Sequence, residues 1–81
     1  MIVDKDDGVD LADVTLENPA FTGRPLRRVR LPGNALVMGI HRKGEIVAPH
    51  GDTVLKRRDT LLLVGSPDAL KEARSLLNGR Q

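Results

Sequence analysis

The sequence predicts an α+β domain with a small mixed or antiparallel β-sheet, a short helix after the first strand, and a C-terminal helix. Three observations support this prediction. Residues 35–42 (ALVMGIHR) and 60–65 (TLLLVG) are apolar runs of strand length. Gly44 stands between the first of these runs and another strand-like segment, which is typical of a β-hairpin turn. Ser66 opens a stretch whose apolar residues recur with the spacing of one helix face.

The size of the chain allows one domain with a thin core. A chain of 81 residues buries only about 60% of the surface that its unfolded form exposes. There is no cysteine, which removes disulfides and the usual structural zinc sites and fits a reducing compartment. Phe21 is the only aromatic residue, so the core must be aliphatic. A small domain without disulfides or a structural metal depends on a partner chain, and we therefore expect a partner chain here.

No apolar run approaches the roughly 20 residues that a membrane-spanning helix needs, so we expect a soluble chain without direct membrane insertion.

Residues 1–8 are polar and acidic, which predicts a disordered terminus or linker. The folded domain is predicted over residues 9–79. Its first strand is expected in residues 9–16 (VDLADVTL), where apolar and polar residues alternate with one slip.

A loop (ENPAFTG) separates the first strand from a predicted short helix. Pro25 is expected at the first helical position, where proline is tolerated. Leu26 and Val29 are three residues apart and would share one face. Pro32 and Gly33 end this helix.

The middle of the chain predicts a hairpin and a last strand. The run at 35–42 is nearly continuous, which favours burial on both faces of the strand. Residues 45–49 (EIVAP) form its partner, and Gly44 supplies the positive φ that the turn requires. Residues 54–55 lie in the loop that follows and are expected to enter the core. The last strand covers residues 60–65.

Capping residues define the C-terminal helix, which we expect from about Pro67 to Leu77. Ser66 is the predicted N-cap, and Asp68 is favourable at the positive end of the helix. Gly79 is the predicted C-terminal stop. The apolar stripe of this helix is expected to comprise Leu70, Ala73 and Leu77, with Ala69 and Leu76 beside it.

Charge is distributed unevenly along the chain. Residues 1–20 hold six acidic residues and one lysine, whereas residues 21–81 hold twelve Lys and Arg and five acidic residues. The basic part could bind an anionic ligand or a nucleic acid. Alternatively, the acidic segment lies against the basic part, or both are solvated.

Candidate catalytic and metal-binding residues are few. Asp52 and Asp59 could be paired carboxylates, but both stand where aspartates commonly stabilise turns. Ser66 lacks the G-x-S-x-G context of a hydrolase nucleophile, and its capping role explains it. His41 and His50 have no cysteines or clustered acids to complete a metal site, so we expect polar edge residues. No G-x-G-x-x-G opens a helix. The sequence therefore predicts neither an enzyme nor a metal site.

The segment FTGRPLRRVRLPGNALVMGIHRKGEIVAPHGDTVLKRRDTLLLVGSPDAL resembles the TrkA-C or RCK-C domain, the C-terminal regulatory subdomain of potassium-conductance and cation-transport regulators. The ordered marks are a G-x-x-L helix, an apolar strand that ends in arginine, a GE hairpin, a GDTVL segment and a strand closed by GSPDAL. One position departs from the family pattern. Arg58 stands where the family usually has glycine before the aspartate that opens the last strand. If this turn needs positive φ, Arg58 is strained by about 1 kcal/mol.

The resemblance implies a non-enzymatic, cytoplasmic regulatory and dimerisation domain of a potassium or cation/proton transport system. Its expected partners are a second copy in a homodimer and a membrane cation transporter or channel subunit at the inner face of the cell membrane, with no nucleic acid and no cofactor. Some family members bind cyclic di-AMP as a regulatory ligand in the groove between subunits. By position, such a groove would be lined here by Arg42, Ile46, Val47, Pro49 and His50, with Arg42 holding phosphate. Alternatively, the apolar residues of this set only form an interface or core.

A small basic nucleic-acid-binding module is the alternative function. The arginines that would contact phosphates are Arg24, Arg27, Arg28 and Arg30. With a single aromatic residue in the chain, little could stack on unpaired bases.

Overall fold

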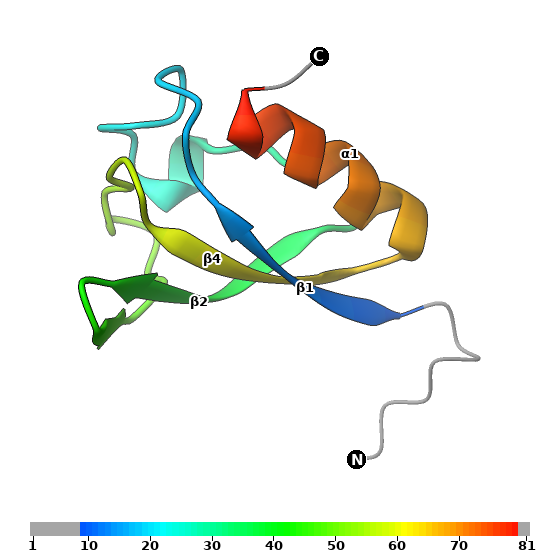
Figure 1. The fold of residues 1–81 in the computed structure, drawn as a ribbon, viewed down its shortest axis with the longest axis horizontal. Coiled ribbons are helices and arrows are strands. Elements are labelled where there is room, and N and C mark those ends of the chain that lie inside the picture. Colours follow the sequence, from blue (N-terminus) through cyan, green and yellow to red (C-terminus); the bar gives the residue numbers. More distant parts are fainter. Residues whose placement is uncertain (1–8, 80–81) are drawn as a thin grey trace.

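The computed structural model describes residues 9–79, which form a four-stranded antiparallel sheet with one helix packed on one face (Figure 1). The elements in chain order are β1 (Asp10–Thr15), the 3-10 helix η2 (Leu26–Arg28), β2 (Leu36–Arg42), β3 (Glu45–Val47), β4 (Thr60–Gly65) and α1 (Pro67–Asn78). The strand order across the sheet is β1-β4-β2-β3, and every neighbouring pair is antiparallel. The α+β prediction is confirmed in its antiparallel form. The expected terminus or linker at 1–8 lies outside the described residues.

Helix α1 begins and ends where its capping residues predict. The Ser66 side chain accepts a hydrogen bond from the Ala69 N–H at 3.2 Å, with Pro67 as the first helical residue. Gly79 adopts a left-handed conformation with φ of 76°, which favours glycine. The helix buries Ala69, Leu70, Ala73 and Leu77. Leu76 stays 36% exposed.

The core lies between α1 and the sheet face that the helix covers, and it is aliphatic apart from Phe21. Alternate residues of each strand point to this face. In the central row of the sheet, Val14 pairs with Leu61, Leu61 with Ile40, and Ile40 with Val47. Val14, Leu61 and Ile40 are at most 1% exposed.

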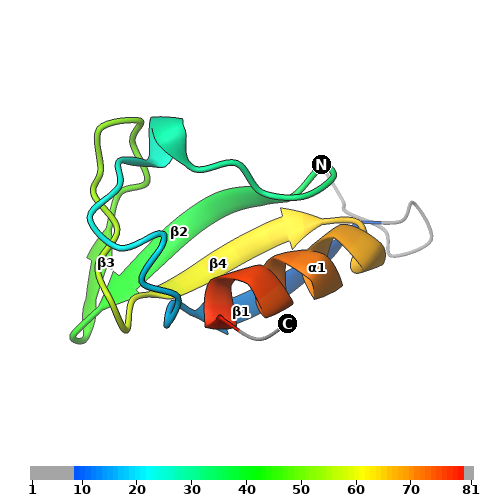
Figure 2. The same ribbon diagram turned by 90° about the horizontal axis from the view of Figure 1, so that it is seen from above.

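The prediction that strand 35–42 is buried on both faces is wrong for the chain taken alone. Leu36 is 65% exposed and Met38 is 52% exposed. The reason is that α1 covers one face of the sheet, and no described element covers the other (Figures 1 and 2).

Three further details differ from the predictions. Pro25 precedes η2 in an extended conformation instead of starting it, because its backbone forms an isolated bridge with Val54. Of the two loop residues expected in the core, Leu55 is buried and Val54 is 42% exposed. The partner strand also ends at Val47, two residues earlier than expected.

Among the described residues, two turns hold a residue other than glycine at positive φ. In the β2–β3 hairpin, Lys43 has φ of 50° and Gly44 has φ of 80°, the pattern of a type I′ turn. Before β4, Arg58 has φ of 76°. The expected strain at Arg58 is therefore present.

Candidate functional site

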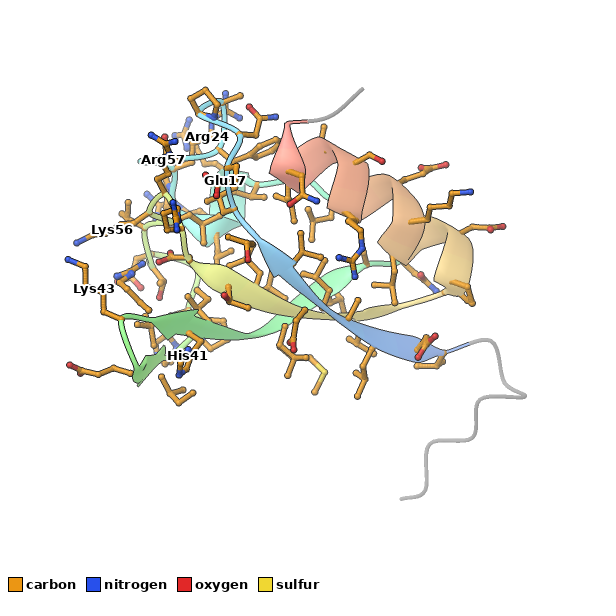
Figure 3. All side chains as sticks on the ribbon, in the orientation of Figure 1. Glu17, Arg24, His41, Lys43, Lys56 and Arg57 are labelled. Carbon is orange, nitrogen blue, oxygen red and sulfur yellow. The ribbon has the colours of Figure 1, made fainter. Side chains whose placement is uncertain are left out.

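The uncovered side of the sheet is an apolar surface, which we call the open face. Its first row across the strands consists of Leu11, Val64 and Leu36, which pair through β4. Leu11 is 56% exposed. The open face comprises Leu11, Asp13, Leu36, Met38, Gly39, His41, Ile46, Thr60, Leu62 and Val64. His41 is labelled on this side in Figure 3. Large apolar side chains that gather on one surface are typical of an interaction site.

Near the hairpin end, the open face holds a hollow of about 310 Å³. Gly39 pairs with Leu62 in the sheet and has no side chain to fill the space above it. Ile46, which is 78% exposed, forms one wall together with Leu62. Asp13, His41 and Thr60 add polar groups to the lining. The hollow thus combines aliphatic walls with a few polar groups, the usual composition of a small-molecule site.

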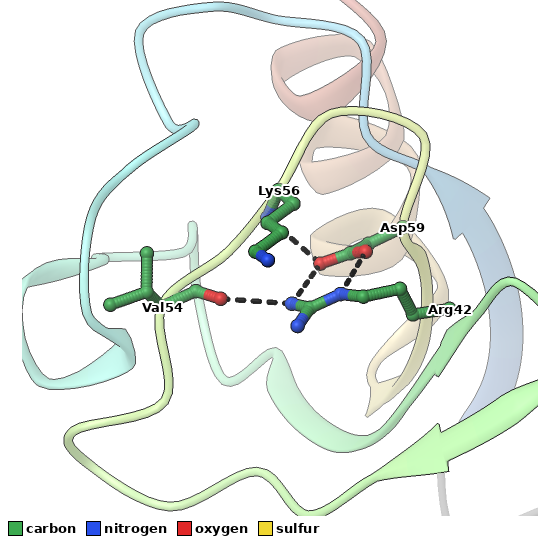
Figure 4. Close-up of polar contacts among 4 residues, drawn as sticks. All are labelled: Arg42, Val54, Lys56 and Asp59. Carbon is green, nitrogen blue, oxygen red and sulfur yellow. Dashed lines mark hydrogen bonds and ion pairs between the residues drawn. The ribbon is translucent and has the colours of Figure 1, made fainter.

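On the opposite face, Arg42 and Asp59 form a two-point ion pair (Figure 4). Arg42 Nε donates to Asp59 Oδ1 at 2.8 Å, and Arg42 Nη2 donates to Asp59 Oδ2 at 2.8 Å. Nη2 also donates to the Val54 carbonyl at 2.9 Å, and the Lys56 N–H donates to Asp59 Oδ2 at 2.9 Å. The Asp59 side chain is 1% exposed. The pair therefore joins the end of β2 to the turn before β4.

The pair changes the protonation equilibria of both side chains. Burial pushes the pKa of Asp59 upward, but the hydrogen bonds from Arg42 and the Lys56 N–H, with the nearby positive charges, outweigh it and hold the pKa below its ordinary value. The hydrogen bond to Asp59 raises the pKa of Arg42 above its ordinary value, against a smaller opposing effect of burial. Both side chains are charged at neutral pH.

Within one chain, the five residues predicted to bind a ligand lie in different places. Ile46 lines the open-face hollow, and Arg42 lines a separate hollow beside the ion pair. Pro49 lines a third cavity, which η2 and the start of β2 border. Val47 packs against the core, and His50 is exposed in the loop after β3. The predicted grouping would need a second chain, and it stays a prediction.

Sequence reasoning missed the Arg42–Asp59 pair. It assigned Asp59 to the turn, which the hydrogen bond from the Lys56 N–H confirms, but it left Arg42 free for a ligand. One signal was available, because strand residues two apart share a face. Arg42 therefore faces the same side as Ile40, toward the core.

Within residues 9–79, the other candidate residues form neither a metal site nor a site for base stacking. Across residues 9–79, no three histidine, cysteine or acidic side chains are placed to hold a metal ion. His41 is exposed on β2, between β4 and β3, and His50 is exposed in the loop after β3. Phe21 is 9% exposed and lies beneath Arg24, whose guanidinium carbon is 5.9 Å from the ring centre. The single aromatic ring is thus not available to stack on a base.

The acidic and basic parts of the chain meet at Glu17. Its carboxylate lies 3.3 Å from Arg57 Nε and 3.6 Å from Arg58 Nε. All three side chains are well exposed, so each pair contributes little to stability. Part of the acidic segment does lie against the basic part, as one interpretation of the sequence held.

The antiparallel sheet and its C-terminal helix define the class of this protein as a small α+β domain. The sequence matches the TrkA-C domain family over residues 11–78, and the chain belongs to that family. This is a family of regulatory domains, and the resemblance noted in the sequence is confirmed. No helix among residues 9–79 has the length and apolar character needed to cross a membrane.

Similar proteins are named as parts of cation transport systems. A putative Na(+)/H(+) antiporter of Bacillus subtilis, YjbQ, is 33% identical over 69 residues, which is 85% of this chain and 11% of that protein. The Trk system potassium uptake protein TrkA of Mycobacterium tuberculosis is 33% identical over 69 residues, which is 84% of this chain and 31% of that protein. The Trk system potassium uptake protein trkA homolog 1 of Methanosarcina mazei is 26% identical over 60 residues, which is 74% of this chain and 15% of that protein. The chain thus spans less than a third of the length of these relatives.

Solved structures share the fold. An "RCK domain with cda" superposes with a TM-score of 0.79 at 28% identity, covering 83% of this chain and 96% of that one. The "RCK_C domain dimer of S.agalactiae BusR in complex with c-di-AMP" gives a TM-score of 0.73 at 18% identity, covering 86% and 97%. At that identity the second likeness concerns the fold alone.

Proposed function

We propose that this domain regulates a potassium or cation/proton transport system from the cytoplasmic side of the membrane, without catalysing a reaction. It acts as a homodimer attached to, or bound by, a transporter or channel subunit. The observation that carries the proposal is family membership over residues 11–78 together with an apolar open face on the sheet.

The homodimer forms through the open face, to which the hairpin region 35–50 contributes Leu36, Met38 and Ile46. These three side chains are between 52% and 78% exposed in the single chain. Covering them removes apolar surface from water, at about 25 cal/mol per Å². An apolar surface of this kind on an isolated domain is a liability unless a partner covers it. A second copy presents the same surface and suits a two-fold interface.

Sedimentation velocity tests the dimer. The unmodified chain is expected to sediment as a dimer at high micromolar concentration, and Met38→Glu as a folded monomer, because a charge in an apolar interface is costly. Glu72→Gln, on the exposed side of α1, is the control and should leave the dimer intact. A monomer at all concentrations for the unmodified chain would refute this assembly.

The regulatory ligand of the dimer is a cyclic dinucleotide such as cyclic di-AMP, bound where the hairpin ends of two copies meet. The support is the set of groups near the hairpin: Ile46 beside a hollow, the exposed Pro49 and His50 in the following loop, and the half-buried Arg42 at the end of β2. Aliphatic side chains can cover the adenine rings, and a cation can hold phosphate.

Isothermal titration with cyclic di-AMP tests the ligand. Binding at tens of micromolar is expected for the unmodified chain. Ile46→Ala should weaken it, whereas Val54→Ala, a comparably small truncation of an exposed side chain outside the open face, should not. If the unmodified dimer releases no heat, the groove is only an interface, and the regulatory role would use another signal.

A further inference from the structure

The turns at one end of the sheet gather a group of cations, which Figure 3 shows through its labelled Lys43, Lys56 and Arg57. They border a hollow of about 320 Å³, which we call the basic hollow. Its lining consists of Arg42, Lys43, Lys56, Arg57, Arg58 and Asp59. Five cations therefore surround a single carboxylate.

The acidic groups nearby do not neutralise this charge. Asp59 is fully used by the two-point pair with Arg42. Glu17 is shared between Arg57 and Arg58 at 3.3 Å and 3.6 Å. Within residues 9–79, neither Lys43 nor Lys56 forms an ion pair. The basic hollow keeps an excess of positive charge.

The backbone holds two of these cations in an unfavourable conformation. Lys43 and Arg58 both have positive φ, at 50° and 76°, a region that residues other than glycine seldom adopt. The strain at Arg58 would vanish with glycine, which the turn geometry suits. Strained backbone positions cluster at functional sites, ligand clamps among them.

We propose that the basic hollow binds an anion that carries two or more phosphate groups. The lysine ammonium groups supply point charges, and the arginine guanidinium groups can each donate to two phosphate oxygens. Arg42 adds a donor, since its Nη1 has no acceptor among the described residues. The aliphatic stems of these side chains form the walls.

This site is separate from the open face, where the apolar walls of the other hollow lie. It shares Arg42 with the cyclic-dinucleotide proposal but does not depend on it. The phosphates could belong to a free compound or to a lipid headgroup, and the chemistry of recognition is the same.

Amide chemical shifts during titration with inorganic tripolyphosphate, at near-physiological ionic strength, test the site. The largest shifts are expected at Lys43 and at residues 56–59. Lys56→Gln and Arg58→Gly should each weaken binding roughly two- to fivefold, the effect of losing one exposed charge pair. Arg58→Gly is the more informative variant, because it removes the cation and suits the turn. The variant is expected to fold at least as stably as the unmodified chain, so its binding loss reports the missing cation.

Lys71→Gln is the matched control, since it removes one positive charge from the exposed side of α1. It should leave tripolyphosphate binding unchanged. Equal weakening by Lys71→Gln, or shifts spread evenly over the basic residues 24–30, would show only general attraction and would overturn the proposal.

Co-sedimentation with cardiolipin vesicles, whose lipid headgroup carries two phosphates, compared with phosphatidylcholine vesicles, assigns the source of the phosphate. If the protein binds the anionic vesicles, and Lys56→Gln and Arg58→Gly each weaken this binding, the proposal is supported and the ligand is a lipid headgroup. If the protein binds tripolyphosphate but not the vesicles, the proposal is supported and the ligand is a free compound. Failure of both probes would overturn it, while the dimer and the cyclic di-AMP test would stand unaffected.

Discussion

Arg42 ties two parts of the sheet together through a single buried carboxylate. It lies at the end of β2, and Asp59 lies 17 positions later in the turn before β4. Because Asp59 is 1% exposed, its charge would be costly without Arg42. The arginine is thus first a structural residue, and any ligand contact that it makes is added to that role.

Replacing Arg42 alone should destabilise the domain. Arg42→Met is expected to lower the free energy of unfolding by about 2–4 kcal/mol, because it leaves a buried carboxylate with only the Lys56 N–H. The double variant Arg42→Met with Asp59→Asn should lose less, since no buried charge remains. Urea denaturation measures both. Arg74→Met on the exposed face of α1 is the control, and a loss for Arg42→Met no larger than for this control would contradict the assignment.

Acid should weaken the fold through Asp59. Its pKa is depressed in the folded chain, so the stabilisation is fully present above the unfolded value of about 3.9 and is lost as pH falls through the lower folded value. The free energy of unfolding should fall as pH drops below about 4 and through the depressed pKa of Asp59. Asp59→Asn should flatten this decline, whereas Asp52→Asn, in an exposed turn, should keep it. An unchanged acid profile in Asp59→Asn would show that other carboxylates cause it.

At the scale of elements, the turns decide where the strands begin. Lys43 and Gly44 both take positive φ in the hairpin, which matches the twist of the paired strands. Arg58 does the same before β4, and its N–H donates to the Leu16 carbonyl at 2.8 Å. This hydrogen bond, together with the Arg42–Asp59 pair, holds Arg58 in a conformation that its side chain disfavours.

Glycine should therefore have opposite effects at two neighbouring positions. Arg58→Gly is expected to raise the free energy of unfolding by roughly 0.5–1 kcal/mol, because it relieves a positive φ. Arg57→Gly is expected to lower it by about the same amount, since Arg57 does not have positive φ and glycine adds freedom to the unfolded chain. Thermal unfolding followed by circular dichroism measures both. A loss of stability in Arg58→Gly would mean that the arginine side chain stabilises the turn more than the strain costs.

At the scale of the whole molecule, one helix covers one side of a four-stranded sheet (Figures 1 and 2). Large apolar side chains are exposed on the other side. The core of a domain this small is thin, and Leu36, Met38 and Ile46 are exposed. Both features favour association with a second copy. Association would add the apolar burial that the single chain lacks.

Stability should therefore depend on protein concentration. Binding of a second copy to the folded state raises the apparent stability by mass action, so the unfolding midpoint should rise over a hundredfold increase in concentration. Met38→Glu should remove this dependence, and Glu72→Gln should keep it. Scanning calorimetry at several concentrations makes the measurement. A midpoint independent of concentration in the unmodified chain would count against the dimer.

The sequence by itself determined the features that depend on near neighbours. Strand β4, the Ser66 cap and the Gly79 stop of α1, and the glycine of the hairpin were all predictable, because each follows from local backbone geometry and short-range periodicity. The strain at Arg58 was expected only from the family resemblance, in which glycine is usual at that position. The family could also be recognised from the order of its turn residues.

Only the tertiary structure decided which surfaces are buried and which charges meet. An apolar run such as 35–42 has the same pattern whether one or two layers cover it, so the open face appeared only when α1 was placed on a single side. Arg42 and Asp59 meet because β2 and β4 pair in a register that also contains a bulge between Val37 and Gly39. Packing across the sheet sets that register. Contacts between residues far apart in the sequence leave no local sequence pattern, so they could not be predicted from one.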